Sequence, residues 1–500
     1  MFEDEHRPLM RKLGKVTLFC VRILEMTFIQ KDNPNFKNNV LPFTYLCDMN
    51  YNSDPICALA TANGVGAISV IRVSGAGSKA LVSKNFSKEL TEKHSHTLHF
   101  GVFSDLVNKA IDEVLISVFD EGKSFTGEES VEISCHGSVY IQQQILQTLC
   151  GSGFRLAEPG EFTQRAFLNG KMDLSQAEAV ADLIASQSKQ AHDVALRQLR
   201  GQFSNQLQEL REKLIQFAAL IELELDFGEE DVEFADRTQL KKLVKEVLAI
   251  VERLANSFSL GNALKNGVPV AIVGAPNTGK STLLNQLLGE DRAIVSNIAG
   301  TTRDVIEETL NIEGILFRLI DTAGIRETTE TIEALGIERS QQKIEQASIV
   351  LCMADATVET SAEKVRTWKT ELENNYPEKK IEFILNKVDA AQPTVSDAFT
   401  ISAKNGDGIE ALKQRLVELV IGNFDLQNDI IVANARHHEA LQKTAVALTQ
   451  ALNGLENGTT GDFVAMDIRE AMLQLGNITG QIDIDTDILG AIFSKFCIGK

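Results

Sequence analysis

The sequence predicts a multidomain protein of the α/β plus α class, in which a helical bundle is interrupted by one α/β domain and preceded by another. Strand and helix patterns alternate over residues 268–422, which is typical of a mostly parallel sheet with flanking helices. Before and after this stretch, apolar residues recur at three- and four-residue spacing, as on amphipathic helices. Helical segments on both sides of one α/β stretch indicate that this α/β domain is inserted in the bundle.

The composition is that of an ordinary globular chain of about three domains. Of its 500 residues, 44% are hydrophobic and 24% are charged. The net charge of -20 argues against a protein that coats nucleic acid, because the field of the whole molecule opposes phosphate, although a local basic patch could still hold RNA. Seven cysteines without a CxxC pair favour free thiols and a cytoplasmic location. No apolar run is long enough to cross a membrane, so no membrane partner is expected.

The first α/β domain is expected over residues 49–168. Two strands around a glycine-rich turn are predicted by "ICALATANGVGAISVIRVSG", and further strands by "DEVLISVF" and "SVEISCHG". Neighbouring side chains of a strand point to opposite faces, so Cys135 and His136 are interpreted as a packed cysteine and a turn histidine, not as a catalytic pair. Residues 1–48 are expected to be an N-terminal extension, which a misassigned start would explain, since no signal-peptide cleavage site follows.

The helical bundle is expected in two parts, residues 169–267 and 423–500. The first part begins with a cap at Asp173 or Ser175 and includes a helix over about residues 238–265. In the second part, "RHH" at 436–438 is expected on a helix surface and lacks acids at metal-ligand spacing. The run "TDILGAIFSKF" carries its apolar residues on one helical stripe, which predicts that the chain end is docked.

A phosphate-binding loop is predicted by "GAPNTGKS" at 274–281, which fits GxxxxGK[ST] between an apolar strand and a helix. In such a loop the backbone amides hold phosphates, Lys280 reaches the β and γ oxygens, and Ser281 coordinates Mg2+.

Four more motifs follow in order, each at the end of a strand. They are "TT" (301–302) for a second Mg2+ ligand, "DTAG" (321–324) for the γ-phosphate, "NKVD" (386–389) and "SAK" (402–404) for the base. The carboxylate of Asp389 suits the N1–H and amine of guanine, whereas adenine would leave it without a donor. The sequence therefore predicts a GTPase domain. Ile325 stands where a water-orienting glutamine could follow "DTAG", and spacing alone does not choose among Glu327, Glu330 and Glu333.

These stretches together resemble the MnmE (TrmE) family of tRNA-modification GTPases. The resemblance runs from about residue 54 to the last residue and includes "PGEFTQRAFLNGKMDLSQAEAVADLI", "IVSNIAGTTRD" and the terminal "FCIGK". It implies a folate-binding first domain through which homodimers form, a discontinuous helical domain and an inserted G domain. It further implies that, with the FAD-containing partner MnmG, the enzyme installs an aminomethyl or carboxymethylaminomethyl group on C5 of the wobble uridine of tRNA. A tetrahydrofolate derivative, formyl or methylene, would supply the one-carbon unit.

The resemblance also implies nucleotide and cation ligands. The residues that would contact GTP are Asn277, Thr278, Gly279, Lys280, Ser281, Thr282, Ser296, Thr301, Thr302, Asp321, Thr322, Ala323, Gly324, Asn386, Lys387, Asp389, Ser402, Ala403 and Lys404. Mg2+ would bind Ser281 and Thr302. The residues that would bind K+, whose charge would replace an arginine finger, are Asn277, Ser296, Ile298 and Thr301. Lys280 would act on the phosphates, and Glu333 is the acid that matches the family's water-orienting residue.

For folate, the family's contacts match Arg72, Glu132, Lys171 and Lys500. A carboxylate can pair with the pterin edge, and the basic side chains suit the glutamate tail. The chain departs from the family at 62–66, where "ANGVG" replaces "PPGRG" and an arginine is lost. Cys497 is either a nucleophile that adds to the pyrimidine ring or a small packed residue.

Two other functions are compatible with the motifs. A GTPase of ribosome assembly would bind RNA without modifying it, but no KH-type GXXG segment follows the G domain. A folate-binding scaffold would use its G domain only as a dimerisation switch. The acidic charge suggests that a more basic partner carries much of the affinity for tRNA.

Overall fold

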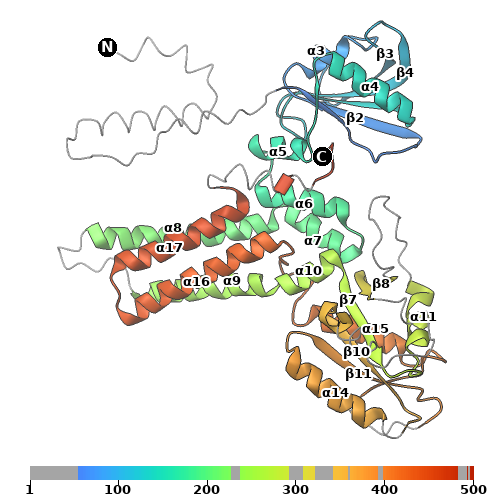
Figure 1. Cartoon of the computed structure of the whole chain (residues 1–500). Coiled ribbons are helices and arrows are strands. Elements are labelled where there is room, and N and C mark those ends of the chain that lie inside the picture. The colour runs from blue at the N-terminus through green and yellow to red at the C-terminus, as the bar shows by residue number, and fades with distance from the viewer. Residues whose placement is uncertain are drawn as a thin grey trace. The chain divides into compact units, whose positions relative to one another are not determined.

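The structure is a computed structural model, and it describes residues 54–226, 237–291, 308–320, 342–358, 361–391, 398–481, 492–493 and 496–499 (Figure 1). By compactness the chain divides into two units, Met1–Asp54 and Pro55–Lys500, and the account that follows concerns the second. The predicted extension at residues 1–48 lies outside the described residues.

The N-terminal domain is built on a six-stranded sheet, called sheet A, in the order β3-β4-β5-β2-β1-β6. Its strands are β1 (Ile56–Leu59), β2 (Ile68–Ser74), β3 (Thr97–Ser104), β4 (Ala110–Phe119), β5 (Ser130–His136) and β6 (Arg155–Leu156). Neighbouring strands are antiparallel except β1 and β6. The two strands expected around the glycine-rich turn are therefore confirmed as β1 and β2.

The two faces of sheet A differ in what covers them. Alternate residues of β5, namely Val131, Ile133 and Cys135, are buried in the core that includes residues of α3 (Ser78–Ser83) and α4 (Val139–Gly151). On the other face, Phe162 of α5 (Glu161–Leu168) packs on β1. His136 is exposed while Cys135 is buried, so their predicted opposite orientation is confirmed.

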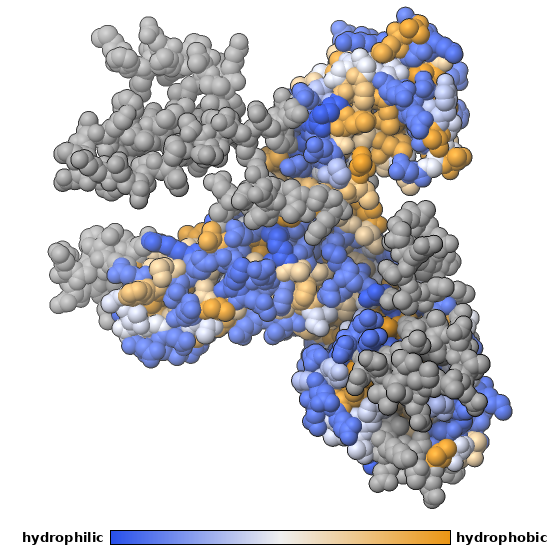
Figure 2. Space-filling model, viewed as in Figure 1, coloured by the Kyte–Doolittle hydropathy of each residue, from blue (hydrophilic) through white to orange (hydrophobic). Residues whose placement is uncertain are grey.

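Part of this second face is open and carries exposed apolar side chains. We call it the open face of sheet A and define it by Ile68, Leu98, Phe100 and Leu115, which are 41% to 67% exposed. Phe100 pairs directly with Leu115 across β3 and β4, so these side chains are neighbours on one face. Hydrophobic surface, coloured orange, is visible on this domain in Figure 2.

The helical domain begins with α6 (Leu174–Ala185), α7 (Lys189–Leu199), α8 (Gln202–Asp226), α9 (Arg237–Asn256) and α10 (Phe258–Asn266). Asp173 accepts a hydrogen bond from the backbone N–H of Gln176, whose side chain accepts from the Asp173 N–H, so the cap predicted there is a capping box. The single helix expected over about 238–265 is wrong, because the chain breaks at Ser257. The Ser257 hydroxyl accepts a hydrogen bond from the N–H of Val432 at 3.0 Å, which ties this break to the second part of the domain.

That second part consists of α16 (Ala435–Asn457) and α17 (Gly461–Thr479), which pack with α8 and α9 around one apolar core. The expectation that "RHH" lies on the surface is wrong. His437 is fully buried, and Arg436 and His437 both contact the buried carboxylate of Glu178 on α6. Helical spacing could not show this, because the partner lies 258 positions away.

The inserted domain lies between α10 and α16 and is built on sheet B, six strands in the order β12-β11-β10-β7-β9-β8. The strands are β7 (Val268–Gly274), β8 (Glu308–Ile312), β9 (Ile315–Leu319), β10 (Ile349–Asp355), β11 (Lys380–Asn386) and β12 (Phe399–Ile401). The described helices are α11 (Lys280–Asp291), α14 (Ser361–Asn375) and α15 (Ile409–Ile421). All strand pairs are parallel except β8 with β9, which confirms a mostly parallel sheet.

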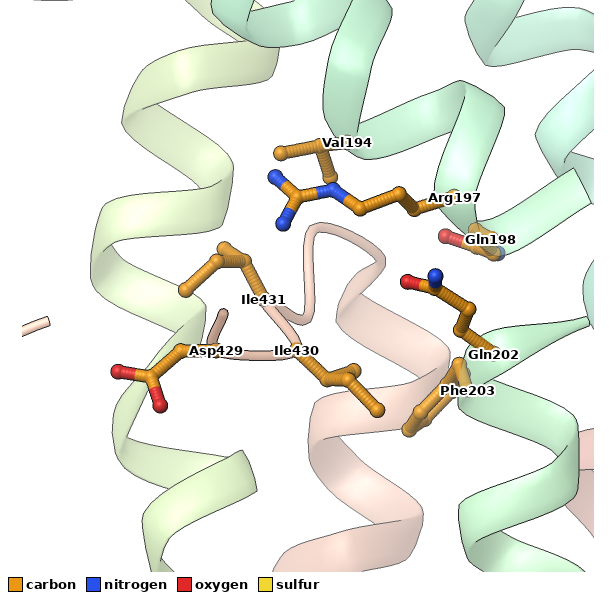
Figure 3. Close-up of a pocket in the computed structure, with 8 residues that line it drawn as sticks. All are labelled: Val194, Arg197, Gln198, Gln202, Phe203, Asp429, Ile430 and Ile431. Carbon is orange, nitrogen blue, oxygen red and sulfur yellow. The ribbon is translucent and has the colours of Figure 1, made fainter. Parts of the chain in front are cut away.

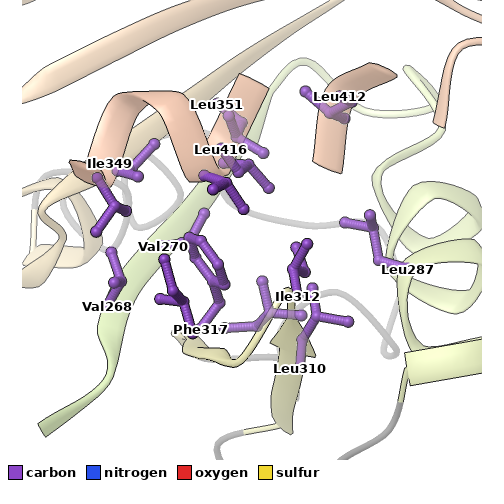
Figure 4. Packing of buried hydrophobic residues seen from close by; sticks show 14 of the residues in the cluster. Val268, Val270, Leu287, Leu310, Ile312, Phe317, Ile349, Leu351, Leu412 and Leu416 are labelled. Carbon is purple, nitrogen blue, oxygen red and sulfur yellow. The ribbon is translucent and has the colours of Figure 1, made fainter. Parts of the chain in front are cut away.

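The core of the inserted domain holds the sheet against its helices. In Figure 4, Val270 and Phe317 from the strands lie with Leu287 of α11 and Leu416 of α15 in one buried cluster. Strand β10 is buried along its whole length, as expected for a central parallel strand covered on both faces. This packing fixes the carboxyl ends of β7, β10 and β11, where the site described below is built.

The end of the chain is docked, as predicted. Phe493 and Phe496 are buried with Leu174 and Ala177 of α6, although residues 482–491 of the predicted helix lie outside the described residues. Gly499 lies so close to β1 that an added Cβ would stand 2.3 Å from the Leu59 carbonyl oxygen. Among the described helices, none is long and apolar enough to cross a membrane.

Candidate functional site

The predicted phosphate-binding loop lies between β7 and α11, at the carboxyl end of sheet B. Asn277 and Gly279 have positive φ angles of 59° and 97°. A Cβ on Gly279 would lie 2.2 Å from Nδ2 of Asn386, so only glycine fits at this position. Thr278 is buried, and its hydroxyl donates to the carbonyl of Ala275 at 2.9 Å.

Lys280 lies folded over this loop. Its Nζ donates to the carbonyl oxygens of Gly274 at 2.9 Å and of Ala275 at 2.8 Å. Burial, together with the positive charge of Lys343, lowers the pKa of Lys280 below its ordinary value. Ser281 follows in the first turn of α11, where its backbone shares the helix N-terminus that favours anions.

The two predicted base-binding motifs meet the phosphate loop at one buried side chain. Nδ2 of Asn386 donates to the carbonyl of Thr278 at 2.8 Å, and its Oδ1 accepts from the N–H of Ala403 at 2.9 Å. The Ser402 hydroxyl donates to Oδ1 of Asp389 at 2.6 Å. This bond, with the charges of Lys404 and Lys387, holds the pKa of Asp389 below its ordinary value and so favours the ionised carboxylate.

Sequence reasoning missed one residue of this site. Asp355 ends β10, and its Oδ2 accepts from Nζ of Lys387 at 2.5 Å. The available signal was a carboxylate at the end of the apolar run "IVLCMAD", but the sequence alone does not show which cation it meets.

In the N-terminal domain, the structure brings two of the predicted folate contacts together. Arg72 and Glu132 are directly paired across β2 and β5, and Nε and Nη2 of Arg72 donate to Oε1 of Glu132 at 2.9 and 2.8 Å. The guanidinium also lies 5.4 Å from the ring centre of Phe125 and 5.8 Å from that of Phe162.

Lys171 joins the same neighbourhood through the loop that carries Phe125. Its Nζ donates to the carbonyl of Gly122 at 3.0 Å, and its stem lies beside Gly127. Cys497 is exposed, so the interpretation as a packed cysteine is wrong. Gly499, two residues later, touches the strand whose Ala58 pairs with Arg72.

The other predicted site residues lie outside the described residues. They are Ser296, Ile298, Thr301, Thr302, Asp321, Thr322, Ala323, Gly324, Glu333 and Lys500. Within the described part of the chain, no three His, Cys, Asp or Glu side chains are grouped as a metal site.

The pocket in Figure 3 belongs to neither candidate site. It lies in the helical domain and is lined by α7, α8 and residues 429–431. Arg197 on its rim donates to the carbonyls of Leu426 at 2.6 Å and Gln427 at 3.0 Å. The pocket therefore marks where the segment after the inserted domain is tied to α7.

Comparison with known proteins places both candidate sites in one family. A model described as the N-terminus of the GTP-binding protein TrmE matches residues 55–171, and one described as the MnmE helical domain matches residues 174–497. The tRNA modification GTPase MnmE of Cytophaga hutchinsonii is 51% identical over 459 residues, which cover 90% of this chain and 98% of that protein. The chain belongs to the MnmE family. The MnmE proteins of Flavobacterium johnsoniae and Bacteroides fragilis are 50% and 51% identical, and each is covered over its full length.

Family membership confirms the resemblance, the fold class and, at the level of the family, the enzyme class of GTP hydrolase. In this MnmE family member the loops of the inserted domain for phosphate and base are joined by Asn386. The Arg72–Glu132 pair belongs to sheet A of the N-terminal domain.

Proposed function

We propose that the protein is a potassium-dependent GTPase that works with a flavoprotein partner, MnmG, on tRNA in the cytoplasm. Together they would install an aminomethyl or carboxymethylaminomethyl group on C5 of the wobble uridine, with the one-carbon unit drawn from a tetrahydrofolate derivative. The observation that carries the proposal is the similarity to the Cytophaga MnmE, which spans 98% of that tRNA modification GTPase. FAD is expected on the partner alone.

GTP binding is supported by the way three loops converge. Asn386 joins the phosphate loop to the "SAK" loop, and Asp389 is held by Ser402 as an ionised carboxylate. Lys280 would stabilise negative charge on the phosphates, since its ammonium group already lies over the loop. Glu333 is proposed to orient the attacking water.

The oxygen-rich ligand set suits hard cations. Ser281 would bind Mg2+ together with Thr302. Asn277, whose side-chain amide offers an oxygen ligand, would bind K+ together with Ser296, Ile298 and Thr301. The backbone of Asn277 has a positive φ, so the phosphate loop turns at this residue. The cations would supply positive charge beside the phosphates.

The folate proposal rests on the Arg72–Glu132 pair and the aromatic ring of Phe125 beside it. Glu132 can accept hydrogen bonds from an amino-pyrimidine edge, and Arg72, Lys171 and Lys500 carry charges that suit a carboxylate tail. The contact of Gly499 with β1 supports a shared site for the folate and the chain end. Cys497 would then be an exposed thiol available for attack on the uridine ring.

The open face of sheet A supports a homodimer. Four large apolar side chains on one sheet face are costly to leave in water, and burying them against a second copy would recover that cost.

The proposal is tested by analysing the wobble nucleosides of tRNA from a strain that lacks the gene. The same strain is analysed after a plasmid has restored either the wild-type gene or the Cys497→Ser variant. Unmodified uridine in the deletion strain, restored by the wild type alone, is the expected result. Intact modification together with accumulation of ribosomal precursors would instead favour an assembly GTPase. In parallel, GTP hydrolysis should be faster in KCl than in NaCl, and equal rates would refute potassium dependence.

A further inference from the structure

The base-binding side of the inserted domain contains an ion pair that joins a residue outside the motifs, Asp355, to the lysine of "NKVD". Oδ2 of Asp355 accepts from Nζ of Lys387 at 2.5 Å, and Oδ1 accepts from the N–H and the hydroxyl of Thr357 at 2.9 and 2.6 Å. Asp355 is only 8% exposed. The carboxylate is thus held on one oxygen by its own turn and presents the other to Lys387.

The position of this pair in sheet B is informative. Strand β10, which ends at Asp355, lies between β7, which leads into the phosphate loop, and β11, which leads into "NKVD". A nucleotide whose phosphates lie on the loop after β7 and whose base meets Asp389 after β11 must therefore pass over the carboxyl end of β10. That is where Asp355 holds the Lys387 ammonium group.

We infer that Asp355 is a positioning residue for guanine-nucleotide binding, which acts by holding the stem of Lys387 as a fixed apolar surface for the nucleotide. The inference rests on the GTP binding of the proposed function and adds to it a residue outside the motifs.

The backbone supports this role. Lys387 has a φ of 67°, a left-handed conformation that is unfavourable for a residue with a Cβ. Its side chain has four methylenes, which lose rotamer freedom when the ammonium group is fixed by the ion pair. Part of the conformational entropy cost of nucleotide binding is therefore already incurred in the free protein. A methylene stem with a fixed end is the kind of surface on which a planar base packs.

A double-mutant cycle on the full-length protein, with GDP affinity measured by calorimetry, tests the inference. We expect Asp355→Asn and Lys387→Met each to weaken GDP binding by about tenfold. The double variant should bind no more weakly than Lys387→Met alone, because Asp355 acts through Lys387. In GTP hydrolysis, Asp355→Asn should raise KM and leave kcat unchanged.

The matched control is Glu382→Gln, which removes a comparable ion pair with Arg415 on the same strand as "NKVD" and should leave GDP affinity unchanged. If Asp355→Asn fails to fold, Thr357→Val serves instead, because it removes the hydroxyl of an exposed residue that donates to the Asp355 carboxylate. This variant should lose less GDP affinity than Asp355→Asn. It should cause no further loss when it is combined with Lys387→Met. Unchanged GDP affinity in Asp355→Asn, or full additivity with Lys387→Met, overturns the inference alone. A wild-type chain that binds no GDP overturns the proposed function and the inference with it.

Discussion

The cluster of Arg436 with the buried Glu178 and His437 gives the sharpest test of how the helical domain is held together. Glu178 on α6 accepts from Nε and Nη2 of Arg436 at 3.0 and 2.9 Å and from Nε2 of His437 at 2.5 Å. Arg436 also donates to the carbonyls of Asn477 at 2.7 Å and Ile478 at 3.0 Å, at the end of α17. Glu178→Gln removes the one buried carboxylate that both side chains contact, and it leaves the Arg436 guanidinium without its counter-charge.

The expected loss follows from the pKa of Glu178. Burial by itself would raise this pKa, but His437 and Arg436 lower it from an ordinary 4.5 to about 2. At about 1.4 kcal/mol for each pH unit, this difference corresponds to about 3 kcal/mol in favour of the ionised, folded state. Breaking a buried ion pair at one partner costs about 3 to 5 kcal/mol, which is the same range. Glu178→Gln should therefore lower the free energy of unfolding at pH 7 by about 3 kcal/mol.

The sign of the pH dependence is fixed by the direction of the shift. Because the pKa is depressed in the folded state, the stabilisation is complete above about pH 4.5 and is lost as the pH falls toward about 2. Urea unfolding followed by far-UV circular dichroism, from pH 7 down to pH 3, should show wild type and Glu178→Gln converging. The control is Glu439→Gln on α16, where water screens an exposed pair with Lys443 and the substitution should leave the free energy of unfolding nearly unchanged. A Glu178→Gln variant as stable as Glu439→Gln at pH 7, or a gap that stays constant to pH 3, would refute the reasoning.

Three further predictions concern the candidate sites. Gly279→Ala should abolish GTP binding in calorimetry, because the added Cβ would stand 2.2 Å from Nδ2 of Asn386 and the φ of 97° is unfavourable for alanine. Measurable GTP affinity would contradict this account of the loop. Glu132→Gln should weaken binding of a formyl-tetrahydrofolate at the proposed folate site by about tenfold in fluorescence titration, since the neutral amide no longer forms an ion pair with Arg72. Unchanged affinity would remove Glu132 from that proposed site. Phe100→Asp should convert the proposed homodimer to a monomer in analytical ultracentrifugation, because a charge cannot be buried unpaired on the open face of sheet A. A dimer that persists would show that another surface is used.

The sequence by itself determined the parts of this protein that depend on short, contiguous patterns. Hydrophobic periods of two and of three to four residues located β1, β2 and the inserted domain, and the phosphate loop was readable because its glycines, lysine and serine stand within eight positions. The cap at Asp173 was likewise a local signal, since both hydrogen bonds of a capping box span three residues.

Only the tertiary structure decided the rest, and the reason is sequence separation. Helical spacing predicted an exposed "RHH", but Glu178, 258 positions earlier, meets Arg436 inside the bundle. The Ser257 hydroxyl at the helix break accepts a hydrogen bond from Val432, 175 positions later, and the partner of Lys387 is Asp355, 32 positions away. A periodic pattern states which face of an element is apolar, but it carries no information about which distant charge or backbone group will lie opposite. Buried polar contacts between elements are therefore settled by packing.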